Sequence, residues 1–262
     1  MEEKCQPPRV SVVIPALNEA QNLRHVLPLI PPVVTEIVLV DGHSTDDTIA
    51  VVQQLGPAIR PPIHIIKQTG KGKGDALRVG FAACVGDIIV TLDADGSTDP
   101  REIPLFVEAL LRGNDFAKGS RCVLGGGSHD FTLLRRLGNY GLRKLVNILF
   151  RARFSDLCYG YNAFWKYCLD YIEEIDCDGF EVETLIHLRI HKAHLKIIEV
   201  PSIEYRRIYG KSNLKAFSDG WSVVLTIVRE RSQNSSPQTR SCSPANPYIV
   251  NDPYSVPENI VL

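Results

Sequence analysis

This 262-residue chain lacks long apolar runs. Its apolar stretches, such as Ile88–Val90 and Val223–Leu225, are far shorter than the roughly 20 residues that a membrane-spanning helix needs. Any membrane contact is therefore expected to be peripheral. The first nine residues carry Glu2, Glu3 and two prolines, without the basic start and apolar run of a secretory signal, so we expect no export.

Closely spaced cysteine pairs and an excess of charge of one sign are also lacking. The seven cysteines are odd in number, scattered and without a C-x-x-C pair, which indicates reduced thiols in a cytosolic protein and argues against a disulfide framework or a zinc site. The 29 basic and 30 acidic side chains give a net charge of -1. No nucleic-acid partner is expected, and an anionic ligand must be met by locally placed cations.

Runs of β-branched and apolar residues alternate with segments of helical spacing through the first half of the chain. The predicted strands are Val10–Ile14, Glu36–Val40, Ile63–Ile66 and Asp87–Leu92, followed by a less regular one at Asp115–Lys118. The predicted helices are Asn18–Ile30, Thr45–Leu55 and, after a flexible lead-in at Gly70, Gly72 and Gly74, Asp75–Cys84. This alternation favours a mostly parallel α/β sheet flanked by helices, with ligands beyond the carboxyl ends of its strands.

The length fits one domain, which we place at residues 1–231, with a nucleotide-binding half at 9–118 and an acceptor half at 119–231. Amphipathic helices are predicted at Arg135–Phe150 and Leu214–Arg229. Residues 232–262 are rich in proline, serine and asparagine and are predicted to be a disordered tail.

The sequence Asp93-Ala94-Asp95 directly follows an apolar strand. In a turn, two carboxylates one residue apart can converge on one hard cation, and oxygen ligands of this kind suit Mg²⁺ or Mn²⁺. A diphosphate could complete the coordination. The sequence therefore predicts a metal site at Asp93 and Asp95.

Other motifs occur in register with this one. They are Pro15-Ala16-Leu17-Asn18-Glu19, Val40-Asp41-Gly42-His43-Ser44, Gly72-Lys73-Gly74-Asp75-Ala76, Gly119-Ser120-Arg121, Gly179-Phe180-Glu181 and Tyr205-Arg206-Arg207-Ile208-Tyr209-Gly210-Lys211-Ser212. Over roughly residues 9–231 their order and spacing resemble the family-two glycosyltransferases, which have the GT-A fold, and in particular the branch that glycosylates polyprenyl phosphates, typified by dolichol-phosphate mannose synthase.

The resemblance implies an inverting enzyme and assigns its donor site. Its nucleotide-sugar-binding residues would be Pro15, Leu17, Glu19, Asp41, Asp93, Ala94, Asp95, Arg121, Arg207 and Lys211, of which Asp95, Arg121 and Arg207 would be catalytic. Leu17 stands where an aromatic residue is common in the branch, and Gly42 where a second acid is common. The base therefore stays open, and the donor is GDP-mannose or a UDP-sugar.

The acceptor implied by the resemblance is a polyprenyl or dolichyl phosphate, with its phosphate near Arg135, Arg136 and Ser212 and the amphipathic helices at the cytoplasmic face of a membrane. An ionised phosphate needs no general base, whereas a saccharide or protein hydroxyl would need one, for which Glu181 or Glu183 could serve. Transfer to such a hydroxyl and a non-catalytic nucleotide-sugar-binding module are the alternatives.

Overall fold

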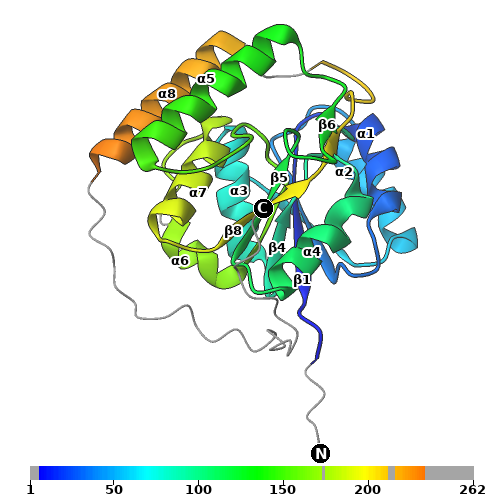
Figure 1. Ribbon diagram of the computed structural model, residues 1–262. Coiled ribbons are helices and arrows are strands. Elements are labelled where there is room, and N and C mark those ends of the chain that lie inside the picture. The colour runs from blue at the N-terminus through cyan, green and yellow to red at the C-terminus, as the bar shows by residue number, and fades with distance from the viewer. Residues whose placement is uncertain (1–5, 173–174, 212–215, 234–262) are drawn as a thin grey trace, which may run out of the picture.

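A computed structural model describes residues 6–172, 175–211 and 216–233, and of Ala216 and Phe217 only the backbone (Figure 1). The predicted phosphate contact at Ser212, the first residues of the second predicted amphipathic helix and the tail from residue 234 onward lie outside these residues. The domain limits and the tail stay predictions.

A seven-stranded sheet forms the centre of the molecule, in the order β3-β2-β1-β4-β7-β5-β8. Its strands are β1 (Val10–Ala16), β2 (Glu36–Asp41), β3 (Ile63–Lys67), β4 (Ile88–Thr91), β5 (Phe116–Ser120), β7 (Asn162–Trp165) and β8 (Ile197–Pro201). A small second sheet pairs β6 (Gly127–Ser128) with β9 (Ile203–Glu204). All pairs are parallel except those of β7 with β4 and β5. The prediction of a mostly parallel sheet is confirmed.

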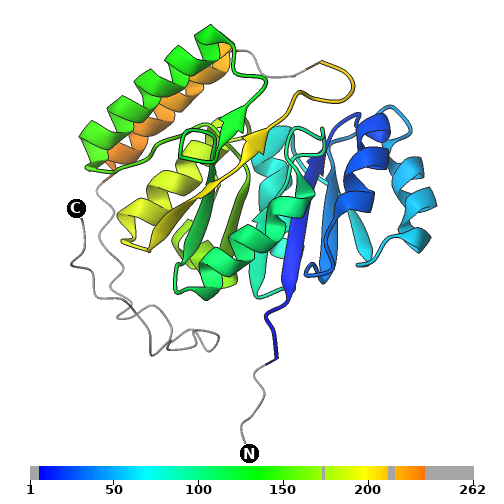
Figure 2. The same ribbon diagram turned by 45° about the vertical axis from the view of Figure 1, so that its right-hand side comes forward.

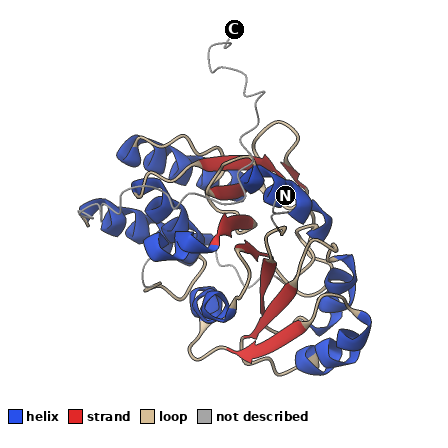
Figure 3. Ribbon diagram, turned by 90° about the horizontal axis from the view of Figure 1, so that it is seen from below, coloured by secondary structure: helices blue, strands red, loops and turns tan. Residues whose placement is uncertain are grey.

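Helices cover both faces of this sheet (Figure 3). They are α1 (Ala20–Val26), α2 (Thr48–Leu55), α3 (Gly72–Ala83), α4 (Ile103–Leu111), α5 (Leu133–Phe150), α6 (Leu169–Ile172), α7 (Glu181–Lys192) and α8 (Ala216–Ser232), with 3₁₀ turns η1 (Leu27–Leu29), η2 (Gly56–Ala58), η3 (Pro100–Glu102) and η4 (Lys166–Cys168). Phe81 of α3 packs edge-on against Phe164 of β7. On the opposite face Phe106 of α4 stacks on Tyr161. The strands between them are fully buried, which explains their continuous apolar sequences.

Several predicted boundaries were wrong. β1 continues through Pro15 because β4 pairs only with residues 10–13 of β1, so the missing N–H of the proline interrupts no ladder. α2 begins at Thr48 instead of Thr45, because residues 44–46 bind the loop after β1. α3 begins at Gly72 instead of Asp75, so two of the three glycines expected in a flexible lead-in belong to the helix.

The antiparallel direction of β7 determines what meets at the carboxyl edge of the sheet. β1, β2, β4, β5 and β8 all end there, and β7 begins there, with Asn162 opposite Thr91, the last residue of β4. Residues 158–161, which precede β7, therefore lie beside the Asp93 loop that follows β4. Arg121 follows β5 and Arg207 follows β9, so residues far apart in the sequence converge on one edge.

The helices α5 and α8 lie side by side beyond this edge, over the half of the molecule that contains β5 and β8 (Figure 2). Val146 of α5 packs with Val223 and Ile227 of α8 in a second, smaller apolar cluster. Both helices also expose an apolar stripe to solvent. Its members are Leu133, Leu134, Leu137, Tyr140 and Ile148 on α5 and Trp221, Leu225 and Val228 on α8. Within the described residues, no helix is long and apolar enough to cross a membrane.

Candidate active site

The Asp93-Ala94-Asp95 turn lies at the centre of the carboxyl edge. Ala94 is buried, which anchors the turn, while the two carboxylates stay partly exposed. Asp93 Oδ1 lies 2.6 Å from Lys73 Nζ. Asp95 Oδ1 accepts a 2.9 Å hydrogen bond from the backbone N–H of Ser97, and its Oδ2 lies 3.4 Å from Arg207 Nε. Each carboxylate thus already faces one cation of the chain.

The predicted nucleotide-binding residues after β1 and β2 lie on neighbouring strands. Asn18, at a positive φ of 58°, accepts hydrogen bonds through Oδ1 from the N–H groups of Thr45 and Asp46, which fastens the two loops together. The buried carboxylate of Asp41 accepts a hydrogen bond from Ser44 N–H. Pro15 is half-buried and Leu17 is exposed beside them. The structure brings these residues together at one end of the edge.

Glu19 is engaged inside the protein. Its buried carboxylate accepts hydrogen bonds from both terminal nitrogens of Arg207, at 2.6 and 3.1 Å, and one at 2.5 Å from Asn22 Nδ2. Burial raises the pKa of Glu19, although Asn22 and Arg207 act in the opposite direction. The amide of Asn22 also bonds the backbone of Tyr209 in both directions. Glu19 and Asn22 therefore fasten the segment around Arg207 to the loop and helix that follow β1.

Arg121 is buried and fully engaged. Its guanidinium pairs with Asp156 at 2.7 and 2.9 Å and with Glu204 at 3.1 Å, and lies over the rings of Phe131 and Tyr159. Burial would raise the pKa of Asp156, but the hydrogen bonds and charge of Arg121 lower it to about 2. Arg121 therefore faces the site from a rigid socket.

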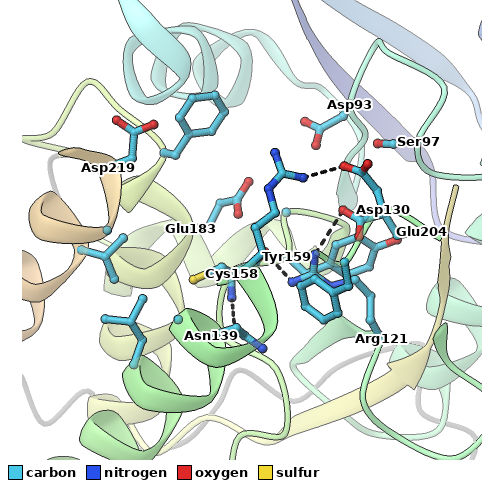
Figure 4. Close-up of a pocket in the computed structure, with 18 of the residues that line it drawn as sticks. Asp93, Ser97, Arg121, Asp130, Asn139, Cys158, Tyr159, Glu183, Glu204 and Asp219 are labelled. Atoms are coloured by element: carbon cyan, nitrogen blue, oxygen red, sulfur yellow. Dashed lines mark hydrogen bonds and ion pairs between the residues drawn. The ribbon is translucent and has the colours of Figure 1, made fainter. Parts of the chain in front are cut away.

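A cavity of about 350 Å³ opens between this edge and the helix pair. Figure 4 shows Asp93 and Ser97 on one side of it and Asn139 of α5 and Asp219 of α8 on the other. The cations of its wall are Lys73, Arg121, Arg135 and Arg207, and its apolar side chains include Phe131, Leu134, Leu142, Phe180 and Val223. One cavity therefore combines a carboxylate pair, several cations and an apolar wall that leads to α5 and α8.

The predicted acceptor residues differ in position. Arg135 lines the cavity and pairs with Asp130 at 2.5 Å. Arg136, the next residue on α5, is exposed and is not among the residues that line the cavity. Lys211 is exposed as well, at the edge of the described residues. The structure thus brings Arg135 to the cavity and leaves Arg136 and Lys211 outside it.

Sequence reasoning missed Lys73 and took Glu183 only as an alternative base. Lys73 Nζ bridges Asp93 Oδ1 and Glu183 Oε1, at 2.6 and 2.5 Å, in the cavity wall. Burial alone would lower the pKa of Lys73, but the two carboxylates raise it above its ordinary value, and burial raises the pKa of Glu183. The motif Gly72-Lys73-Gly74 carried a signal, since a lysine between two glycines at a strand-to-helix turn can approach a site closely.

The oxygen chemistry of the site fits a divalent metal ion. Asp93 and Asp95 offer hard carboxylate oxygens from one turn, as Mg²⁺ or Mn²⁺ prefers. Among the residues that the structure describes, no group of three or more His, Cys, Asp and Glu side chains could hold a metal ion. The other ligands would have to be substrate oxygens or water, which is the way Mg²⁺ is commonly bound beside phosphates.

Comparison with known proteins agrees with this geometry. The family model described as glycosyl transferase family 2 matches residues 11–174. A dolichol-phosphate mannosyltransferase of Pyrococcus furiosus is 31% identical over 212 residues, which cover 79% of this chain and 59% of that protein. An undecaprenyl-phosphate mannosyltransferase of Micrococcus luteus is 30% identical over 229 residues, which cover 82% of this chain and 91% of that one.

A solved structure supports the fold. Glucosyl-3-phosphoglycerate synthase from Mycobacterium tuberculosis, in complex with Mn²⁺, UDP-glucose and phosphoglyceric acid, superposes with a TM-score of 0.69 at 23% identity, covering 86% of this chain and 80% of that one.

The chain belongs to glycosyl transferase family 2, and the resemblance expected from its motifs is confirmed. The predicted GT-A fold is confirmed too. The chain spans 59% of the length of the Pyrococcus protein.

Proposed function

We propose that the protein transfers a hexose from GDP-mannose or a UDP-sugar to the phosphate of a polyprenyl-phosphate lipid, with inversion at the anomeric carbon. The observation that carries this proposal is the cavity, which has carboxylates and cations at one end and an apolar wall on α5 and α8 at the other. A lipid phosphate has these two properties in one molecule. Two of the relatives carry names of enzymes that act on such lipids.

In this proposal the nucleotide lies along the ends of β1 and β2. Pro15 and Leu17 contact the base or ribose. The carboxylate of Asp41 accepts hydrogen bonds from the ribose hydroxyls or from an N–H of the base. Glu19 serves mainly through Arg207, because its oxygens are already engaged. Lys211 reaches the diphosphate from the exposed end of the same segment.

Asp93 and Asp95 would hold Mg²⁺ or Mn²⁺, which supplies positive charge beside the leaving diphosphate when bound. Arg207, 3.4 Å from Asp95, adds a planar guanidinium that can bind two phosphate oxygens at once. Such fixed charges stabilise the transition state without reorganising during the reaction.

The acceptor phosphate would lie near Arg135, with the buried Arg121 also in the cavity wall, and the resemblance assigns Arg136 and Ser212 to the same phosphate. One of its oxygens attacks the anomeric carbon while the bond to the diphosphate oxygen breaks, and the nucleoside diphosphate leaves with the electron pair. The attacking oxygen is already ionised near neutral pH, so the step needs no base. Much of the rate would come from holding the two substrates in line.

The lipid tail would extend from the apolar cavity wall toward a membrane. The exposed stripes on α5 and α8 suit contact with the lipid interface, and Tyr140 lies beside two cations, Arg143 and Lys144. We therefore propose peripheral binding at the cytoplasmic face of a membrane.

The reaction is tested by incubating the purified protein with GDP-mannose or a panel of UDP-sugars and Mn²⁺, with and without a polyprenyl phosphate, and identifying products by mass spectrometry. Hexose transfer that requires the lipid phosphate is the expected result. Transfer to a soluble saccharide with none to the lipid would refute the acceptor assignment.

Transfer to a hydroxyl is the second candidate, because Glu183 lies in the cavity where a base could act. Its Oε1 is already bound to Lys73, which lowers the pKa of this carboxyl and so acts against the increase that burial causes. Loss of saccharide transfer in Glu183→Gln, with binding of the nucleotide sugar unchanged, would support this candidate.

Membrane binding is tested by co-sedimentation with liposomes that contain anionic lipid. Leu225→Ser on α8 should weaken binding several-fold, because it removes apolar area from the lipid interface. Leu105→Ser on α4 is the matched control, since Leu105 is 51% exposed and Leu225 53%. Equal effects of the two substitutions would contradict the proposed membrane face.

A further inference from the structure

Lys73 joins the two halves of the site. It lies in the first turn of α3, and its ammonium bridges Asp93 after β4 and Glu183 in the first turn of α7. Its side chain is only 11% exposed and that of Glu183 only 10%, while Asp93 is 34% exposed. Lys73 is therefore a buried cation with two different carboxylate partners, one inside the protein and one facing the cavity.

The backbone around this bridge is closely fitted. Gly74 donates a 2.9 Å hydrogen bond to the carbonyl of Asp178, and a Cβ on Gly74 would lie 1.9 Å from the carbonyl oxygen of Cys177. A Cβ on Gly160 would lie 2.0 Å from Glu183 Oε1 and 2.9 Å from Lys73 Nζ. The backbone at residues 177–178 thus packs closely on the turn that carries Lys73, and the backbone at residue 160 packs closely on the pair of Lys73 and Glu183.

In this arrangement Lys73 would compete with a metal ion for the carboxylate of Asp93. An ion bound by Asp93 would lie near the ammonium that now neutralises that carboxylate, and the two positive charges would repel each other. Glu183 would keep Lys73 paired in either state. An ammonium has three donors, and Asp93 and Glu183 use two of them, so a phosphate oxygen could accept from Lys73 when Asp93 turns to the metal.

We propose that Lys73, tethered by Glu183, is a positioning cation that couples the metal to the donor diphosphate. In the empty site it neutralises Asp93 and weakens binding of the metal alone. When a nucleoside diphosphate enters, the ammonium donates to a diphosphate oxygen and releases Asp93 to the metal. The inference rests on the proposed metal site at Asp93 and Asp95.

Thermodynamic linkage makes the inference measurable. If Lys73 couples the two ligands, a nucleoside diphosphate must strengthen Mn²⁺ binding, and Mn²⁺ must strengthen nucleotide binding by the same factor. Coupling between sites commonly amounts to about 5- to 150-fold in affinity. A lysine that merely packs in the wall would leave this factor unchanged when replaced.

The experiment measures the Kd for Mn²⁺ by electron paramagnetic resonance of the free ion, on the full chain, without nucleotide and with UDP or GDP. Lys73→Met should tighten binding of Mn²⁺ alone by about fivefold or more, and should reduce the gain from nucleotide by at least the same factor. Glu183→Gln should weaken binding of Mn²⁺ alone, because Lys73 then has only Asp93 as a partner.

The double variant Lys73→Met with Glu183→Gln guards against misfolding, because it leaves no unpaired buried charge. The double variant should bind Mn²⁺ alone at least as tightly as wild type does. Its gain in Mn²⁺ affinity from nucleotide should be as small as that of Lys73→Met. Lys71→Met removes an exposed charge two residues away and should change neither value.

The possible failures are distinguishable. If nucleotide strengthens Mn²⁺ binding by the same factor in wild type and in Lys73→Met, the proposed role of Lys73 is wrong and the proposed function still stands. Absence of Mn²⁺ binding in wild type, with or without UDP or GDP, would overturn the metal site and the coupling together.

Discussion

The contact between Glu19 and Arg207 leads to a prediction that separates two roles for Glu19. The family resemblance assigns Glu19 to the nucleotide, whereas the structure shows both of its oxygens bound to Arg207. If Glu19 acts by orienting Arg207, its replacement should matter only while Arg207 is present. If it binds the nucleotide directly, the two substitutions should act independently.

The size of the effect follows from the geometry. A hydrogen bond to a charged group contributes about 1.5–3 kcal/mol to binding, and the side chain of Arg207 is only 19% exposed. Arg207→Ala should therefore lower kcat/KM by about 10- to 150-fold, at roughly 1.4 kcal/mol for each factor of ten. Glu19→Gln should lower kcat/KM by about tenfold in the wild-type background. In the Arg207→Ala background it should lower kcat/KM by less than about threefold.

The assay is kcat/KM for hexose transfer in the four proteins of this double-mutant cycle, with urea unfolding of each to verify the fold. Arg206→Ala is the matched control, because this neighbouring arginine is exposed and donates only to the carbonyl of His129 among the contacts found for it. If the losses in kcat/KM of Glu19→Gln and Arg207→Ala multiply in the double variant, the orienting role is refuted. Glu19 would then be assigned to direct binding of the nucleotide.

Three further predictions concern the metal turn, acid stability and close packing. Asp95→Asn should abolish turnover while the melting temperature stays near that of wild type, because a metal ligand loses its charge; turnover within a few fold at saturating Mn²⁺ would contradict this. The lowered pKa of Asp156 predicts about 2 kcal/mol of stability that is present above pH 4 and lost as the pH falls toward 2; urea unfolding against pH should show a flatter acid limb in Asp156→Asn. Gly160→Ala should impair transfer by displacing Glu183, whereas Gly141→Ala, where a Cβ meets nothing within 4 Å, should raise the melting temperature.

The sequence by itself determined the family and predicted that carboxylates gather at the carboxyl edge of the sheet. Asp41 and the Asp93-Ala94-Asp95 turn each follow a buried apolar strand, and the carboxyl ends of parallel strands share one edge. Local patterns therefore placed these carboxylates at the same edge of the sheet without knowledge of packing. The helix Leu133–Phe150 was likewise predicted from its periodicity to within two residues at its start.

Only the tertiary structure decided which charges meet. Glu19 lies 188 residues from Arg207, and Lys73 lies 110 residues from Glu183. These pairs depend on the reversed direction of β7 and on the path of the chain after β9, which short apolar strands do not encode. Ion pairs carry no periodic signal, because each needs only one suitable side chain at the place where two distant segments cross. The physical reason is that periodicity reports burial along one element, whereas a site is made by the packing of several.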